Sequence, residues 1–252
     1  MILILVGMYI LFSRYKKYIE EKSKQKGYYN YLPRSVAEAF TLAEVLTVLV
    51  VVSIIAALTI PSFVNSINEP QYNAGVNKVY SLFSQAVQTL QTNNGTVNIG
   101  NAAAGADATV TRTDFCSVMT CVKQDTGSNV FGPVNYKWYK GALMSPFWPG
   151  SNTNPSAILN NGTAVMFMSY STCTNAGVNA CGYVHVDING ANGPNMEGQD
   201  LFSFWIVLNN GVYSILPLGV AADGFSCVAG GSSWVTTEGC TYQRIINPNK
   251  MP

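Results

Sequence analysis

With 252 residues, of which 48% are apolar and 11% charged, the chain allows one domain or two and is too apolar to be intrinsically disordered. The charged fraction is far below the roughly 25% of an ordinary soluble domain, which argues against a freely soluble cytosolic enzyme. Residues 1–39 carry a net charge of +4, from seven basic and three acidic side chains. Residues 40–252 carry a net charge of −3, from seven basic and ten acidic side chains. We therefore expect no basic surface for binding nucleic acid in residues 40–252.

The first 39 residues combine a short apolar run with a basic stretch. Residues 1–12 are apolar but shorter than the roughly 17–25 residues that cross a bilayer. Residues 13–39 are polar and contain seven basic side chains: Arg14, Lys16, Lys17, Lys22, Lys24, Lys26 and Arg34. The apolar start has two interpretations, a start codon set too early or a second hydrophobic segment.

Residues 40–64 are predicted to form a transmembrane helix, because these 25 residues contain one charge, Glu44. At about 1.5 Å per residue they would span about 37 Å, enough to cross a membrane. The basic cluster precedes the span and only Lys78 follows it closely, so residues 65–252 are expected outside.

Residues 65–94 are predicted to continue this helix as an amphipathic segment. Their apolar positions recur at intervals of three and four: Val76, Val79, Tyr80, Phe83, Val87 and Leu90. Asn93-Asn94-Gly95 is typical of a helix end. One helix over 40–93 would be about 81 Å long, with Pro61 and Pro70 as points of distortion. The alternative is two helices broken at residues 68–70.

Residues 95–252 are predicted to form a β-rich domain. Residues 95–160 are rich in Gly, Asn, Ala and Thr and indicate loops and short elements. Strands are expected at 163–170, 182–188, 201–208 and 212–216. Leu-Asn-Asn-Gly occurs at 159–162 and 208–211, in both cases between apolar runs, and indicates hairpin turns. The expected fold class is α+β, with the long N-terminal helix packed on an antiparallel sheet.

The segment Phe40-Thr41-Leu42-Ala43-Glu44-Val45-Leu46, followed by the apolar run and Pro61, resembles the processing and methylation segment of type IV pilins and type II secretion pseudopilins. The resemblance covers about 25 residues closely. It implies that a prepilin peptidase removes residues 1–39 by cleavage between Ala39 and Phe40, and that Phe40 is then N-methylated. It also implies that Glu44 pairs with the amino terminus of a neighbouring subunit during assembly. Family members most often have Gly where this chain has Ala39.

Six cysteines all lie beyond residue 115, with one histidine and no Cys-x-x-Cys pair, which favours disulfides in an oxidising compartment over a metal site. Fifteen pairings are possible. We favour pairing between sequence neighbours, and the alternative is reduced thiols. The neighbour pairs are Cys116 with Cys121, Cys173 with Cys181, and Cys227 with Cys240, the last of which resembles the C-terminal loop of pilins.

The loop 187–200 contains oxygen donors that suit a hard cation such as calcium: Asp187, Asn189, Glu197 and Asp200. The resemblance adds that major pseudopilins have a calcium site in a loop of their sheet domain. The alternative is a structural turn held by Asx hydrogen bonds, with no cofactor.

No catalytic residue is predicted. The single histidine, His185, lies in the alternating run 183–187, where a satisfied surface or rim position is expected. No G-x-S-x-G nucleophile motif and no phosphate-binding glycine loop after a strand occurs.

By resemblance, the chain is expected to be a structural subunit of a type IV pilus or a type II secretion pseudopilus, not an enzyme. The implied partners are copies of itself, other pilins, the prepilin peptidase, and an assembly ATPase acting through a platform protein. The expected location is the bacterial inner membrane, with one span and the C-terminal domain outside, and then an extracytoplasmic filament. The alternatives are a minor pilin acting as an adhesin or uptake module, and an anchored enzyme.

Overall fold

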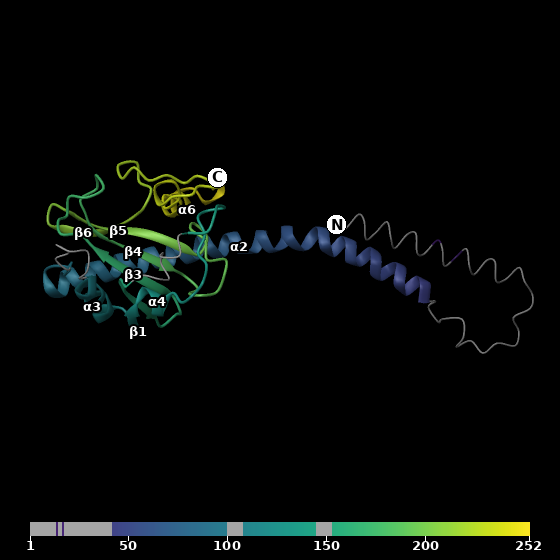
Figure 1. Ribbon diagram of the computed structural model, residues 1–252, viewed down its shortest axis with the longest axis horizontal. Helices are drawn as coiled ribbons and strands as arrows, with labels where there is room; N and C mark the ends of the chain where they lie inside the picture. The colour runs from purple at the N-terminus through teal and green to yellow at the C-terminus, as the bar shows by residue number, and fades with distance from the viewer. Residues whose placement is uncertain (1–13, 15–16, 18–41, 100–107, 145–152) are drawn as a thin grey trace, which may run out of the picture. The chain divides into compact units, whose positions relative to one another are not determined.

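The computed structural model describes residues 14, 17, 42–99, 108–144 and 153–252 (Figure 1). Of residues 42–44 and 61–67 only the helical backbone is described. The chain divides into two compact units, Met1–Ser62 and Phe63–Pro252.

The second unit contains a six-stranded sheet and the helices that accompany it. The strands are β1 Cys121–Thr126, β2 Pro155–Leu159, β3 Ala164–Ser169, β4 Ala180–Asp187, β5 Leu201–Asn209 and β6 Val212–Pro217. The helices are α2 Leu42–Asn94, which starts in the first unit, α3 Ala108–Val118, α4 Gly127–Val130, α5 Trp234–Thr237, α6 Cys240–Ile246 and the 3₁₀ helix η2 Pro248–Lys250.

The sheet is an antiparallel meander in which each strand pairs with its neighbours in sequence. The four predicted strands correspond to β3, β4, β5 and β6. Both Leu-Asn-Asn-Gly turns are confirmed, since they connect β2 to β3 and β5 to β6. Gly162 (φ 85°), Asn210 (φ 52°) and Gly211 (φ 81°) adopt the left-handed backbone that such turns need. Sequence reasoning missed β1 and β2, which lie in or beside the Gly- and Asn-rich region.

One face of the sheet packs against α2 and α3. Val76, Phe83 and Leu90 of α2 are fully buried, so the predicted amphipathic face of residues 76–90 is confirmed. Phe83 contacts Phe115 of α3 and Phe167 of β3, with ring centroids 5.5 and 6.4 Å away. The backbone of α2 is helical through residues 68–70, where the alternative prediction put a break.

The opposite face of the sheet is covered by irregular segments and by α6. Figure 1 shows the strands lying between α3 on one side and α6 on the other. Because side chains alternate along a strand, His185 of β4 and Ser203 and Trp205 of β5 all point to this second face. All three are buried. The second face therefore contains both apolar and polar buried groups.

The expected fold class and location need a correction. The sequence predicted a pilin-like fold whose N-terminal helix is first transmembrane, over 40–64, in an inner-membrane protein. Within the described residues, no helix is long and apolar enough to cross a membrane. The predicted antiparallel sheet and disulfides are present in the structure. Disulfides are typical of proteins in an oxidising environment.

Candidate functional site

The residues predicted to act in processing are not placed by the structure. Ala39 and Phe40 lie outside the described residues. Glu44 lies in the first two turns of α2, and its side chain is outside the description. Cleavage, methylation and the assembly role of Glu44 therefore remain predictions.

All six cysteines form disulfides, each with its neighbour in sequence, as predicted. Cys116–Cys121 connects the end of α3 to the start of β1. Cys173–Cys181 closes the connection that leads into β4. Cys227–Cys240 ties the segment after β6 to the first residue of α6. The disulfides thus hold short loops against the sheet.

Of the predicted cation ligands in loop 187–200, Asp187 and Asp200 serve as hydrogen-bond acceptors for their own surroundings. Asp187 accepts the Tyr136 hydroxyl at 2.7 Å and the Asn189 amide at 3.1 Å. Asp200 accepts the amides of Asn195 and Met196, both at 2.7 Å. The bond from the Asn189 amide to Asp187 is the Asx turn that the sequence left open as the alternative, whereas Asp200 binds amides earlier in the same loop.

The described part of the chain contains no group of three or more Asp, Glu, His or Cys side chains arranged to hold a metal ion. Burial, with a contribution from the nearby Asp200, raises the pKa of Asp187 to about 8. At neutral pH the Asp187 carboxyl is therefore largely protonated, so a cation binding there would have to displace this proton. In the described part of the chain, the buried side-chain oxygens of Asn189 and Asn195 have no hydrogen-bond partner.

Replacing Tyr136 by Phe is expected to lower the free energy of unfolding by about 1–3 kcal/mol, because it leaves the buried Asp187 carboxyl without this donor. The loss should be larger at pH 9 than at pH 7, since Asp187 ionises near pH 8. Urea unfolding at both pH values measures this, with Tyr213→Phe, a half-buried tyrosine on β6, as control. Equal stability of the Tyr136 variant and the native chain would contradict this role.

His185 is fully buried, so the predicted surface or rim position is wrong. Its Nδ1 lies 2.7 Å from the Ser203 hydroxyl, directly across the β4–β5 ladder. Its Nε2 lies 3.8 Å from Oε1 of Glu238. Burial lowers the pKa of His185 to about 3, so the ring stays neutral. Serine, histidine and glutamate are the residue types of a hydrolase triad. Ser203 is 0% exposed, however, so a substrate has no access to its hydroxyl.

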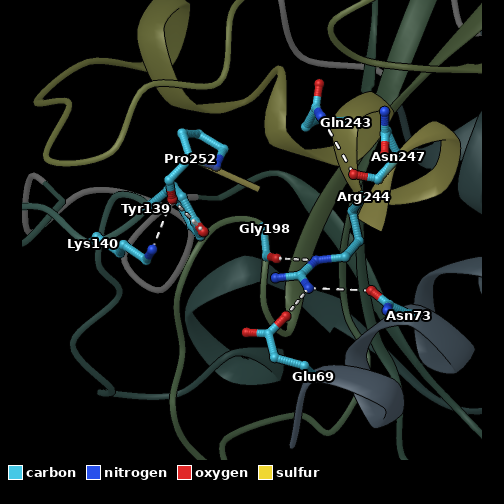
Figure 2. A network of polar contacts seen from close by, with 9 residues as sticks. All are labelled: Glu69, Asn73, Tyr139, Lys140, Gly198, Gln243, Arg244, Asn247 and Pro252. Carbon is cyan, nitrogen blue, oxygen red and sulfur yellow. Dashed lines mark hydrogen bonds and ion pairs between the residues drawn. The ribbon is translucent and has the colours of Figure 1, made fainter. Parts of the chain in front are cut away.

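A polar network is centred on Arg244 of α6 (Figure 2). The Arg244 side chain is fully buried. Its Nε donates a hydrogen bond to the Gly198 carbonyl at 2.9 Å. Its Nη1 donates to Glu69 and, at 3.2 Å, to Asn73, both on α2. It also lies 5.9 Å from the centre of the Tyr72 ring. One side chain thus joins α6, the β4–β5 loop and α2. Sequence analysis missed it, because 175 residues separate Arg244 from Glu69.

A surface pocket of about 410 Å³ lies beside this network. Lys140 and Tyr139, on its wall, both donate hydrogen bonds to the Pro252 carbonyl, at 2.7 and 3.1 Å (Figure 2). The lining mixes a carboxylate, an ammonium group and amides without a nucleophile paired to a base. The residues that line it are Glu69, Pro70, Asn73, Tyr139, Lys140, Pro248, Asn249 and Met251. This chemistry suits polar contacts rather than bond cleavage.

Comparisons with family models, with curated proteins and with solved structures find no match for this chain.

Proposed function

We propose that this protein is a structural subunit of a filament of the type IV pilus or type II secretion pseudopilus kind, processed by a prepilin peptidase and assembled through the first part of α2. Its work is assembly rather than catalysis. The partners that this proposal implies are copies of the chain, other pilins, the peptidase, and the ATPase and platform protein that drive assembly.

The observation that carries the proposal is the exposed apolar surface of α2. Between residues 45 and 60, eleven large apolar side chains are 37–76% exposed: Val45, Leu46, Val48, Leu49, Val50, Val51, Val52, Ile54, Ile55, Leu58 and Ile60. Monomeric proteins rarely expose contiguous apolar surface of this extent. A helix that is apolar on all sides is stable when other apolar surface covers it. Copies of the same helix, packed side by side in a filament core, would supply that cover.

The Phe40–Glu44 segment gives this packing a defined register. A free amino group at Phe40 and the carboxylate of Glu44 are each costly to bury alone, and each neutralises the other. When the amino group and the carboxylate belong to adjacent subunits, the pair is satisfied only in one register. Setting register is the best-attested use of a buried ion pair.

Replacing Glu44 by Gln is expected to abolish filaments while leaving the amount of processed subunit unchanged, because Gln keeps the size of Glu but cannot neutralise a buried amino group. Electron microscopy of sheared cell-surface material counts the filaments. The intact mass and N-terminal peptide of the subunit report whether cleavage occurs after Ala39. Asp114→Asn, which removes an acidic side chain from α3, is the matched control. Filaments of native number and length with Glu44→Gln would refute the assembly role.

A further inference from the structure

The segment α5–α6 is fastened to the second face of the sheet through the loop that precedes β5. Arg244 donates to the Gly198 carbonyl, and the Ser203 amide donates to the Thr241 hydroxyl at 2.9 Å. The packing against this loop is close, because a Cβ added at Gly198 would lie 2.7 Å from Cβ of Cys240. The segment 234–246 therefore closes over the polar groups on the second face.

Two glutamates lie buried in this contact. Glu197, from the β4–β5 loop, is 0% exposed, and neither of its carboxyl oxygens has a hydrogen-bond partner among the residues that the structure describes. Glu238, which follows α5, is 3% exposed and lies 3.8 Å from the neutral ring of His185. The two carboxyl groups are close enough to repel each other if both were charged.

The other ionisable groups around the pair do not neutralise it. The buried cation Arg244 is ion-paired with Glu69 through Nη1, and its Nη2 has no hydrogen-bond partner among the described residues. The remaining ionisable groups that act on the pair carry no positive charge. They are the carboxyl of Asp200 in the β4–β5 loop, the neutral imidazole of His185 on β4, and the phenols of Tyr183 on β4 and Tyr170 after β3. Two buried carboxylates without a counter-ion cost far more than two buried carboxylic acids.

We propose that Glu197 and Glu238 form a proton-dependent latch, which holds the segment 234–246 on the sheet while both carboxyls are protonated and releases it when they ionise. The released segment carries Arg244 with it, so opening also breaks its bonds to Glu69 and Asn73 of α2. The latch lies within the unit Phe63–Pro252 and does not depend on filament assembly.

The direction of the pH effect follows from proton linkage. Burial raises the pKa of Glu238 to about 8 and that of Glu197 well above its ordinary value, whereas both groups should titrate near their ordinary values once the segment is open. The closed state therefore binds more protons than the open state, and opening becomes more favourable as pH rises towards 8. Below pH 6.5 His185 has the opposite effect. Its ring stays neutral in the closed state, where its pKa is about 3, but it becomes protonated when opening exposes it to water. The cleanest window is pH 6.5–8.

Native-state hydrogen exchange of the full chain, kept in a mild detergent, tests the latch. After correction for intrinsic exchange rates, the opening constant of amides in 240–246 should rise about tenfold or more between pH 6.5 and pH 8. Amides of α3, on the other face of the sheet, serve as the internal control and should change much less. A rise in α6 no larger than that in α3 would overturn the proposal on the native protein alone.

Glutamine substitutions identify the groups responsible, because glutamine imitates a protonated glutamate. Glu238→Gln should reduce the pH dependence of α6 opening. In the double variant Glu197→Gln, Glu238→Gln, the opening constant should change by less than about twofold between pH 6.5 and pH 8. Asp114→Asn, on α3, should leave the pH dependence unchanged. A double variant that keeps the native pH dependence would show that other groups are responsible and would refute the latch.

Discussion

Replacing Phe83 by Ala is expected to lower the free energy of unfolding of the unit Phe63–Pro252 by about 3–5 kcal/mol. Phe83 is 0% exposed and contacts Phe115 and Phe167, which lie 5.4 Å from each other. The substitution deletes a fully buried aromatic ring and leaves a cavity between α2, α3 and β3. Because three elements meet there, the site cannot easily collapse to fill it.

Urea unfolding monitored by tryptophan fluorescence measures this loss as a shift of the midpoint at constant slope. Thr89→Ala is the matched control, because Thr89 is exposed on the same helix and its substitution should change stability by less than about 0.5 kcal/mol. A Phe83→Ala cost below about 1 kcal/mol would mean that residues 76–90 of α2 are not part of this core.

Replacing Arg244 by Met should lower the free energy of unfolding by about 3 kcal/mol, the second largest effect expected here. Met fills part of the volume but leaves the Gly198 carbonyl and the Asn73 side chain without their donor. Arg244→Lys should recover little of this loss, because one ammonium group cannot reproduce the planar fork that reaches Gly198 and α2 together.

Glu69→Gln should cost less than Arg244→Met, about 1 kcal/mol or less, because the Glu69 side chain is 49% exposed and water screens its charge. Urea unfolding of both single variants and of the double variant measures the coupling between them. Equal losses for Arg244→Met and Glu69→Gln would contradict this account, since they would mean that the ion pair, not the bond to Gly198, holds α6.

The parts of the fold that the sequence predicted are those specified by local patterns. Alternation and turn residues located β3 to β6 and both Leu-Asn-Asn-Gly turns, and three-four spacing located the buried face of α2. The predicted pairing of neighbouring cysteines is confirmed because each disulfide closes a short loop. The two cysteines of a pair are between 5 and 13 residues apart in sequence.

The features that sequence reasoning missed depend on contacts between distant segments. His185 has the alternation of a half-exposed strand, but segments distant in sequence, among them the one that carries Glu238, cover the second face and bury it. Likewise Arg244 resembles an ordinary charge on a short helix, since its partners Gly198 and Glu69 lie 46 and 175 residues away. The oxygen-rich loop 187–200 suggested a cation site because composition cannot tell a cation ligand from a carboxylate that accepts backbone hydrogen bonds.

The most direct test of filament assembly through α2 is photo-cross-linking from Leu49, which is 56% exposed. A photoreactive residue at this position, activated by light in native cell-surface material, should give covalent dimers and higher multimers of this chain. The same residue at Thr89, exposed on the part of α2 that packs on the sheet, should give far fewer. A Leu49 derivative that yields only monomer would contradict the proposal that copies of this helix cover one another.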